Sequence, residues 1–149
     1  MGAVAEPMPA LSVLAPLTTP DFTTLSRYVR IYSDAVGLRD WEFEIMHRPP
    51  DEALAFVKVD VHELRKYAAL WFCLDFRRLA AEFQRHCIVH ELVHVHIAEM
   101  GFVFRSTRED LGRIHFEALD RSYLRAEEKA VDALTGVIAP ALPVIDWCA

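Results

Sequence analysis

The stretch from residue 83 to residue 101, FQRHCIVHELVHVHIAEMG, constrains the fold of this chain more than any other. It contains His90-Glu91-Leu92-Val93-His94, the pattern H-E-x-x-H. On an α-helix, residues four apart lie on one face about one turn from each other, so both imidazoles can reach a single ion. Glu91 points about 100° away from His90 and can contact a water on that ion without binding the ion itself.

The residues around this pattern predict that the helix is buried, because almost all of them are apolar. They are Ile88, Val89, Leu92, Val93, Val95, Ile97 and Ala98. A buried polar group without a partner costs about 1–3 kcal/mol, and an unpaired charge costs more. We therefore interpret His90, Glu91 and His94 as a metal site rather than as core residues.

A third protein ligand is expected, because catalytic zinc sites have three protein ligands and one open position. The best candidates lie in the later helical stretch 125–132. Glu128 and Asp132 are four residues apart, so one carboxylate can bind the metal while the other orients a histidine through its second ring nitrogen. Glu128 is favoured as the ligand, but Glu127 competes because it is on the apolar face of the helix. His115 is a further candidate.

The periodicity of the whole chain predicts an α+β fold with one layer of sheet against helices. Short connections between the predicted strands favour a small three-stranded, mainly antiparallel sheet. The predicted elements are a helix from Thr19-Pro20-Asp21 to Gly37, strands at 41–47, 53–61 and 66–76, the H-E-x-x-H helix at 78–100 capped by Gly101, and helical structure from 111 to 138 with a bend near Ser122.

The length of 149 residues predicts one domain. Residues 1–18 are rich in Pro and Ala, and we interpret them as an N-terminal arm. Residues 19–149 form the predicted domain.

Charge and composition exclude several classes of partner. The net charge is −6 and the basic residues are scattered, so no nucleic-acid partner is expected. The three cysteines have no C-x-x-C spacing, which argues against a disulfide framework and favours the cytoplasm. The N-terminus does not have the pattern of a signal peptide, and no run of 18 uncharged apolar residues follows, so no membrane association is expected.

The two candidate motifs together resemble the gluzincin branch of the zincin metallopeptidases, in which H-E-x-x-H is completed by a glutamate from a later helix. Glu128-Lys129-Ala130-Val131-Asp132 fits the second motif of that branch, E-x-x-x-D. The short length, the order of sheet before active helix, and the ending at 133–140 look like the small ImmA/IrrE-type and phage-encoded minimal metallopeptidases. Ile97 stands where the metzincin branch has glycine, so that branch fits less well.

The resemblance implies a zincin-like single domain that hydrolyses peptide bonds in a protein or peptide substrate. Zn²⁺ would be held by His90, His94 and Glu128, and Glu91 would be the general base. The strand beginning at Tyr67 would be a sheet edge along which a substrate pairs.

Two questions stay open at this point. A donor to the oxyanion is needed, and Tyr123, His115 or an arginine are candidates. The alternative function is a metal-stabilised binding or regulatory module, of phage or prophage type, that keeps the fold without proteolysis.

Overall fold

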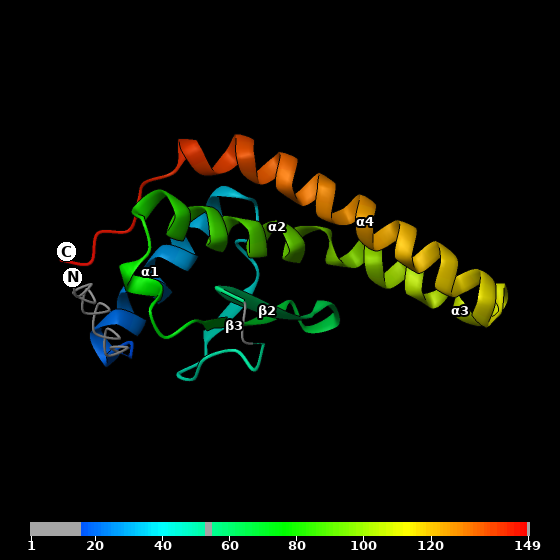
Figure 1. The fold of residues 1–149 in the computed structure, drawn as a ribbon, viewed down its shortest axis with the longest axis horizontal. Coiled ribbons are helices and arrows are strands. Elements are labelled where there is room, and N and C mark those ends of the chain that lie inside the picture. The colour runs from blue at the N-terminus through cyan, green and yellow to red at the C-terminus, as the bar shows by residue number, and fades with distance from the viewer. Residues whose placement is uncertain (1–15, 53–54, 149) are drawn as a thin grey trace, which may run out of the picture.

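The structure is a computed structural model that describes residues 16–52 and 55–148. It confirms the α+β class: helices pack against one small sheet (Figure 1). The predicted arm falls almost wholly on residues 1–15, outside the described residues. The helices and strands are α1 (Thr19–Ala35), β1 (Glu42–Ile45), β2 (Val57–His62), β3 (Tyr67–Phe72), α2 (Ala81–Ser106), α3 (Arg108–Leu111) and α4 (Arg113–Ile138), with short 3₁₀ turns η1 (Glu63–Arg65), η2 (Phe76–Arg78) and η3 (Ala139–Ala141).

The sheet has three strands, as predicted, but it is mixed rather than mainly antiparallel. Its strand order is β1-β3-β2, with β1 parallel and β2 antiparallel to β3. The strand with the most continuous apolar run, β3, takes the central position, where residues 68–70 are all buried. A strand buried on both faces needs such a run, which places β3 between the other two.

The prediction that the strand beginning at Tyr67 forms a sheet edge was also wrong, because β3 pairs with β1 on one side and with β2 on the other. The backbone amide of Cys73 donates to the carbonyl of Phe56, which makes these two residues a hydrogen-bonded pair. In an antiparallel ladder such pairs alternate, so the amides and carbonyls of Val57, Val59 and Val61 point away from β3. Of the two edge strands in the described part of the chain, β1 and β2, it is β2 that therefore presents an open edge beside α2.

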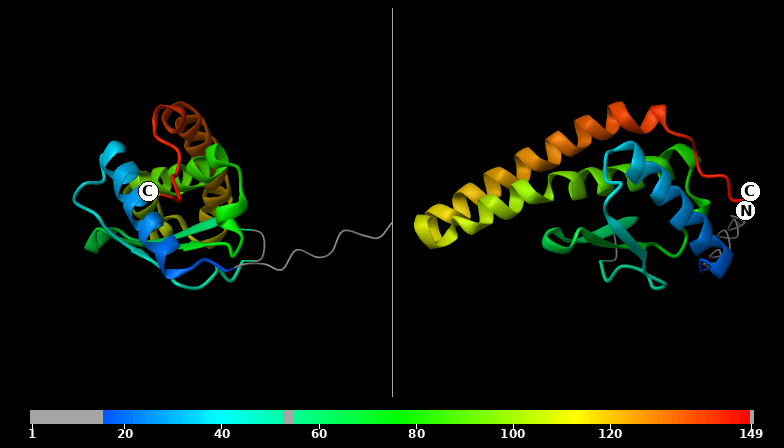
Figure 2. Two further views of the ribbon diagram at one scale, coloured as in Figure 1. Left: turned by 90° about the vertical axis from the view of Figure 1, so that its left-hand side faces the viewer. Right: turned by 180° about the vertical axis from the view of Figure 1, so that it is seen from behind.

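The central helix α2 lies between the sheet and α4, and α1 lies beside it (Figures 1 and 2). It is longer than predicted: Gly101 is an ordinary helical residue, and the helix ends at Ser106. The chain then turns through α3, and α4 runs back alongside α2, so that the two form a hairpin projecting beyond the sheet. The break expected near Ser122 occurs instead at Gly112, whose φ of 68° favours glycine.

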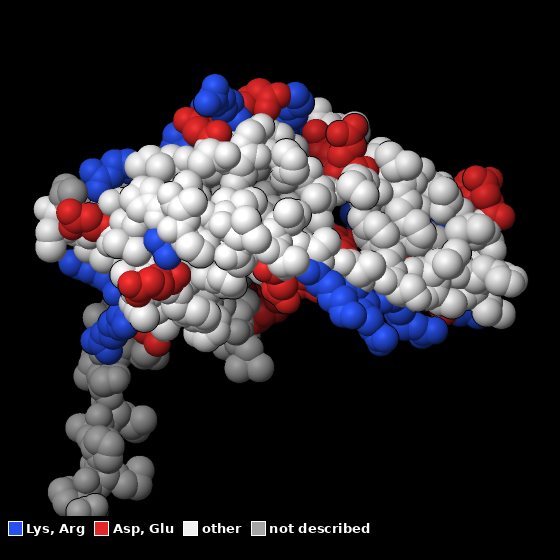
Figure 3. All heavy atoms as spheres, turned by 90° about the horizontal axis from the view of Figure 1, so that it is seen from above, with Lys and Arg blue, Asp and Glu red and all other residues white. Residues whose placement is uncertain are grey.

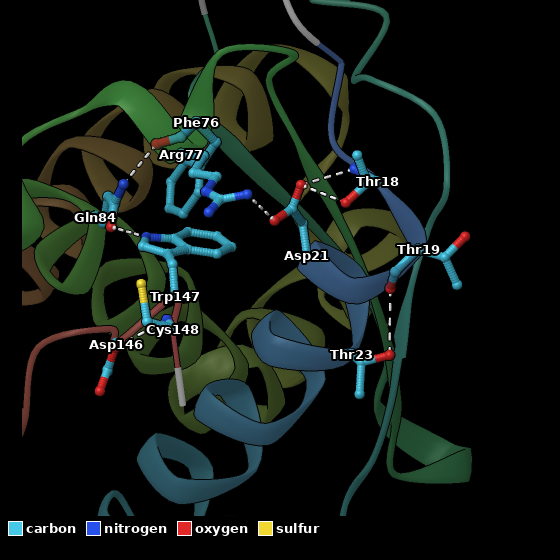
Figure 4. A network of polar contacts seen from close by, with 10 residues as sticks. All are labelled: Thr18, Thr19, Asp21, Thr23, Phe76, Arg77, Gln84, Asp146, Trp147 and Cys148. Atoms are coloured by element: carbon cyan, nitrogen blue, oxygen red, sulfur yellow. Dashed lines mark hydrogen bonds and ion pairs between the residues drawn. The ribbon is translucent and has the colours of Figure 1, made fainter.

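The N-terminal end of α1 and the C-terminal tail meet in one polar network (Figure 4). Asp21 accepts hydrogen bonds of 2.8 Å from the Thr18 amide and hydroxyl, and a further 2.8 Å bond from Arg77. The Arg77 guanidinium lies over the Trp147 ring, and Trp147 donates to the buried Gln84 at the start of α2. The tail is thus tied to α1, η2 and α2 together.

Charged side chains are distributed unevenly over the surface. Seen from above, Lys and Arg form a row along one side of the projecting hairpin, while Asp and Glu form several small groups (Figure 3). By length and composition alone, α2 is long and apolar enough to cross a membrane, although the core helix of a soluble protein passes the same test.

Candidate metal centre

His90 and His94 on α2 and Glu128 on α4 come together with one ligand atom of each within 4.8 Å of the others. His94 Nε2 is 3.3 Å from Glu128 Oε1, and His90 Nε2 is 3.8 Å from Glu128 Oε2. Ligand atoms about 2.0–2.1 Å from a tetrahedral zinc ion are separated from one another by about 3.4 Å. The donor set and its spacing therefore fit a metal ion.

The second ring nitrogen of each histidine faces a different carboxylate. Glu127 Oε1 is 3.2 Å from His94 Nδ1, and Asp132 Oδ1 is 3.3 Å from His90 Nδ1. Three carboxylates of one helix thus surround two imidazoles of the other. Their side-chain exposure differs, because Glu127 is 14% exposed whereas Glu128 and Asp132 are 59% and 70% exposed.

The electrostatic surroundings favour a neutral imidazole at His90. Burial and the neighbouring His94 lower the pKa of His90, although Glu128 and Asp132 act in the opposite direction. Neutral imidazole is the form of histidine that binds metal ions.

Glu91 lies between α2 and the edge of β2. Its carboxyl group accepts a hydrogen bond from the outward-pointing backbone amide of Val59. Burial and the nearby Glu128 carboxylate raise the pKa of Glu91 to about 7, although the bond from Val59 lowers it. A carboxyl group with a pKa near neutrality exchanges protons readily with water and substrate.

Two cavities flank Glu91 along β2. The distal cavity, of about 370 Å³, is lined by Val59, Asp60, Val61, Glu63, Glu91, His94, Ala98, Arg105 and Glu127. The proximal cavity, of about 330 Å³, is lined by Ala55, Phe56, Val57, His86, Cys87, His90, Glu91 and Asp132. Glu91 lines both cavities, with His94 in the distal one and His90 in the proximal one, so the two cavities adjoin at the candidate site.

The structure does not bring every candidate histidine to the site. His115 is exposed on α4, thirteen residues before Glu128 and hence about 20 Å away along the helix axis. His96 is exposed and lines a different cavity, as expected for a residue on the opposite side of α2. His86 lies one turn before His90, with 6.4 Å between the ring centroids, and lines the proximal cavity.

One residue of the site, Arg105, was not identified from the sequence alone. Arg105 lines the distal cavity although it is eleven residues beyond His94, because α2 continues past Gly101. Tyr123, a candidate oxyanion donor from the sequence, lies near Arg105, since both contact the position of Gly101. Burial and then the Glu127 charge raise the pKa of Tyr123, against the influence of Arg105. The regular helical spacing from His94 through Ala98 and Gly101 could have pointed to Arg105, had the helix not been predicted to end at Gly101.

The chain was compared with protein-family models, with curated proteins and with solved structures, and none of the three comparisons gave a match.

Proposed function

We propose that this protein is a zinc-dependent peptidase in which His90, His94 and Glu128 hold the metal and Glu91 is the general base. One observation carries the proposal: Nε2 of both histidines faces the Glu128 carboxylate, while each Nδ1 faces another carboxylate. An Nδ1–H that donates to a carboxylate leaves the lone pair of Nε2 for a metal ion and fixes the orientation of the ring.

Two imidazoles and one carboxylate form a set of ligands that suits zinc and leaves a fourth position open. When bound at such a site, zinc polarises a carbonyl group and makes a water molecule more acidic. The fold order, with a small sheet before the active helix and a glutamate from a later helix, supports a zincin-like domain of the gluzincin type.

Glu91 would take the proton of the attacking water and pass it to the leaving amine. The hydrogen bond from the Val59 amide holds its carboxyl group beside the edge strand, on the same side of α2 as the two cavities. General acid–base catalysis of this kind contributes about 10²- to 10⁴-fold to the rate.

The substrate would be an extended segment of a protein or peptide that pairs with the open edge of β2. Val61 offers an outward amide and carbonyl for such pairing, and Val59 offers its carbonyl. The proximal and distal cavities would receive side chains on the two sides of the bond to be cleaved.

We also propose that the protein acts in the cytoplasm without a membrane or nucleic acid. Its three cysteines are unpaired, and burial raises the pKa of the Cys73 and Cys87 thiols to about 12 and 11. The long apolar helix α2 packs on the sheet and α4 and carries the polar site, which supports its being a core helix.

The proposal is tested with Glu91→Gln on zinc-loaded protein and a peptide library as substrate. We expect Glu91→Gln to retain zinc and fold and to lose about 10²-fold or more of the cleavage rate. Glu82→Gln, an exposed change at the start of the same helix, is the control and should retain full activity.

Full activity of Glu91→Gln would remove Glu91 as the general base. Zinc bound by a wild-type protein that cleaves nothing would favour the alternative, a metal-stabilised module without catalysis. In that case Glu91→Gln should change no property of the protein, whereas His94→Ala should abolish partner binding.

A further inference from the structure

Arg105 has a position in the distal cavity that the proposed chemistry does not use. It follows His94, Ala98 and Gly101 at intervals of four, three and four residues, so all four lie on one face of α2. Ala98 forms part of the cavity wall beside His94, and Arg105 lies toward its far end, close to Glu63. The cavity thus extends along α2 from the candidate metal site to a guanidinium group.

Gly101 makes room for this guanidinium. A Cβ atom at position 101 would lie 3.0 Å from Arg105 Nη2 and 3.1 Å from the Tyr123 hydroxyl. Both donors therefore lie against the bare backbone of one helical residue. Glycine in a helix interior lowers helix stability by about 1 kcal/mol relative to alanine. The room for Arg105 and Tyr123 at Gly101 is therefore kept against the intrinsic preference of the helix.

The guanidinium retains donors for a ligand. Among the described residues its nearest carboxylate is that of Glu63, whose Oε1 is 4.0 Å from Arg105 Nη2, which is too far for a hydrogen bond. The three other acidic residues that line the cavity have neighbours of their own. Asp60 lies 3.5 Å from His62 Nε2, Glu127 faces His94, and Glu91 accepts from a backbone amide. Among the described residues that line this cavity, Arg105 is the only Lys or Arg.

We infer that Arg105, with Tyr123 beside it, binds a carboxylate of the peptide substrate and so selects an acidic residue or a free C-terminus at a fixed distance from the cleaved bond. This inference rests on the proposed function and names a preference of the same site. A guanidinium binds a carboxylate through two parallel hydrogen bonds, and a phenol hydroxyl can add a third.

The distance to the cleaved bond follows from the helix. Gly101, over which the guanidinium lies, is seven residues beyond His94, or about 10 Å along the axis. An extended peptide advances about 3.3 Å per residue. The selected carboxylate is therefore about three residues from the bond that is cleaved.

The test measures binding, so that it does not depend on hydrolysis. Fluorescein-labelled peptides that differ only in having Glu, Gln or Lys at one position are titrated with the Glu91→Gln protein, with zinc and after chelation. A second set compares a free C-terminal carboxylate with an amide. We expect a carboxylate at one position, in one of the two sets, to improve affinity about 5- to 10-fold over its neutral counterpart.

Three variants in the same background assign the effect. Arg105→Ala should abolish the preference, and Gly101→Ala, which favours the helix, should weaken it by displacing both donors. Arg108→Ala is the matched control, because Arg108 lies over the Phe116 ring outside the cavity, and it should keep the preference.

Four results would each overturn the inference. The first is equal affinity for Glu and Gln peptides and for acid and amide ends, and the second is tighter binding of the Lys peptides. The third is a preference that survives Arg105→Ala, and the fourth is no binding at the highest soluble protein concentration. A wild-type protein that cleaves peptides without regard to this position would overturn it while leaving the proposed function intact. A carboxylate preference that depends on Arg105, in a protein that cleaves no peptide, would support carboxylate binding by Arg105 and contradict the proposed peptidase function.

Discussion

At the residue scale, two neighbouring carboxylates on α4 differ in burial and in the histidine nitrogens that they face. Glu127 is nearly enclosed and faces a ring nitrogen of His94, whereas Glu128 is more exposed and faces both histidines. An enclosed carboxylate beside Nδ1 orients its histidine and makes the ring a better ligand. We therefore treat Glu127 as a positioning residue and Glu128 as the metal ligand.

Replacing Glu127 by alanine should weaken zinc binding without removing the site. Loss of such an orienting partner typically costs 10- to 100-fold in metal affinity, and the stoichiometry at saturating zinc should not change. Competition with a chromophoric chelator measures the affinity, with the exposed Glu117→Ala on the same helix as control. A Glu127→Ala protein that binds no zinc at saturation would make Glu127 the ligand instead.

The sequence allowed much of this site to be predicted, because helical spacing alone puts His90 and His94 on one face. It did not decide between Glu127 and Glu128. The apolar face on which Glu127 lies favoured its burial, and burial is compatible with either role. Only the packing of α4 against α2 determines which carboxylate faces both histidines.

At the element scale, the decisive feature is the open edge of β2 beside α2. The amide of Val61 points toward this edge, whereas the amide of Asp60 belongs to the ladder with β3. Proline at an outward position removes an edge donor without breaking the sheet.

Val61→Pro should therefore reduce peptide binding and cleavage more than Val61→Ala does. Both variants lose the side-chain contacts of Val61 with the core, but only proline lacks the amide. Steady-state kinetics of the two variants, with circular dichroism to confirm folding, measure the difference, which we expect to be about 10-fold, roughly the value of one hydrogen bond of 1–1.5 kcal/mol. Equal kinetics of the proline and alanine variants would mean that substrate does not pair with β2.

The sequence could not supply the topology behind this edge. Alternation in Trp41, Phe43 and Ile45 predicted β1 correctly, and the apolar run predicted β3, but pairing depends on contacts between distant residues. β1 and β2 follow each other in the sequence but are not neighbours in the sheet, because β3 lies between them. Neither the mixed sheet nor the edge position of β2 has a local sequence signal.

At the scale of the whole molecule, the C-terminal tail holds the end of the domain opposite the projecting hairpin (Figure 1). The Tyr32 hydroxyl donates to the Pro143 carbonyl, and the Asp146 amide donates to the Tyr28 hydroxyl. The Asp21 network of Figure 4 joins the same elements through Arg77 and Trp147. These contacts bridge α1 and the tail around the start of α2, the helix that carries the site.

The stability of this end should depend on pH through Asp21. Burial alone would raise the pKa of Asp21, but hydrogen bonds from Thr18 and the charge of Arg77 together lower it below its ordinary value of 3.8. The stabilisation is therefore complete above that value and is lost as the pH falls through the lowered pKa.

Asp21→Asn should accordingly lower the free energy of unfolding by about 1–2 kcal/mol at neutral pH. The difference from wild type should shrink below pH 3.8. Urea denaturation at a series of pH values measures it, with the exposed Asp51→Asn as control. A difference that is independent of pH would contradict a role for the charged carboxylate.

The central claim is that His90, His94 and Glu128 hold one zinc ion, and bound metal per chain tests it most directly. Elemental analysis of untagged protein should find about one zinc per chain in the wild type, none in His94→Ala and little in Glu128→Ala. A wild-type protein that retains no zinc after zinc is supplied and the excess removed, or a Glu128→Ala protein that retains it undiminished, would contradict the account.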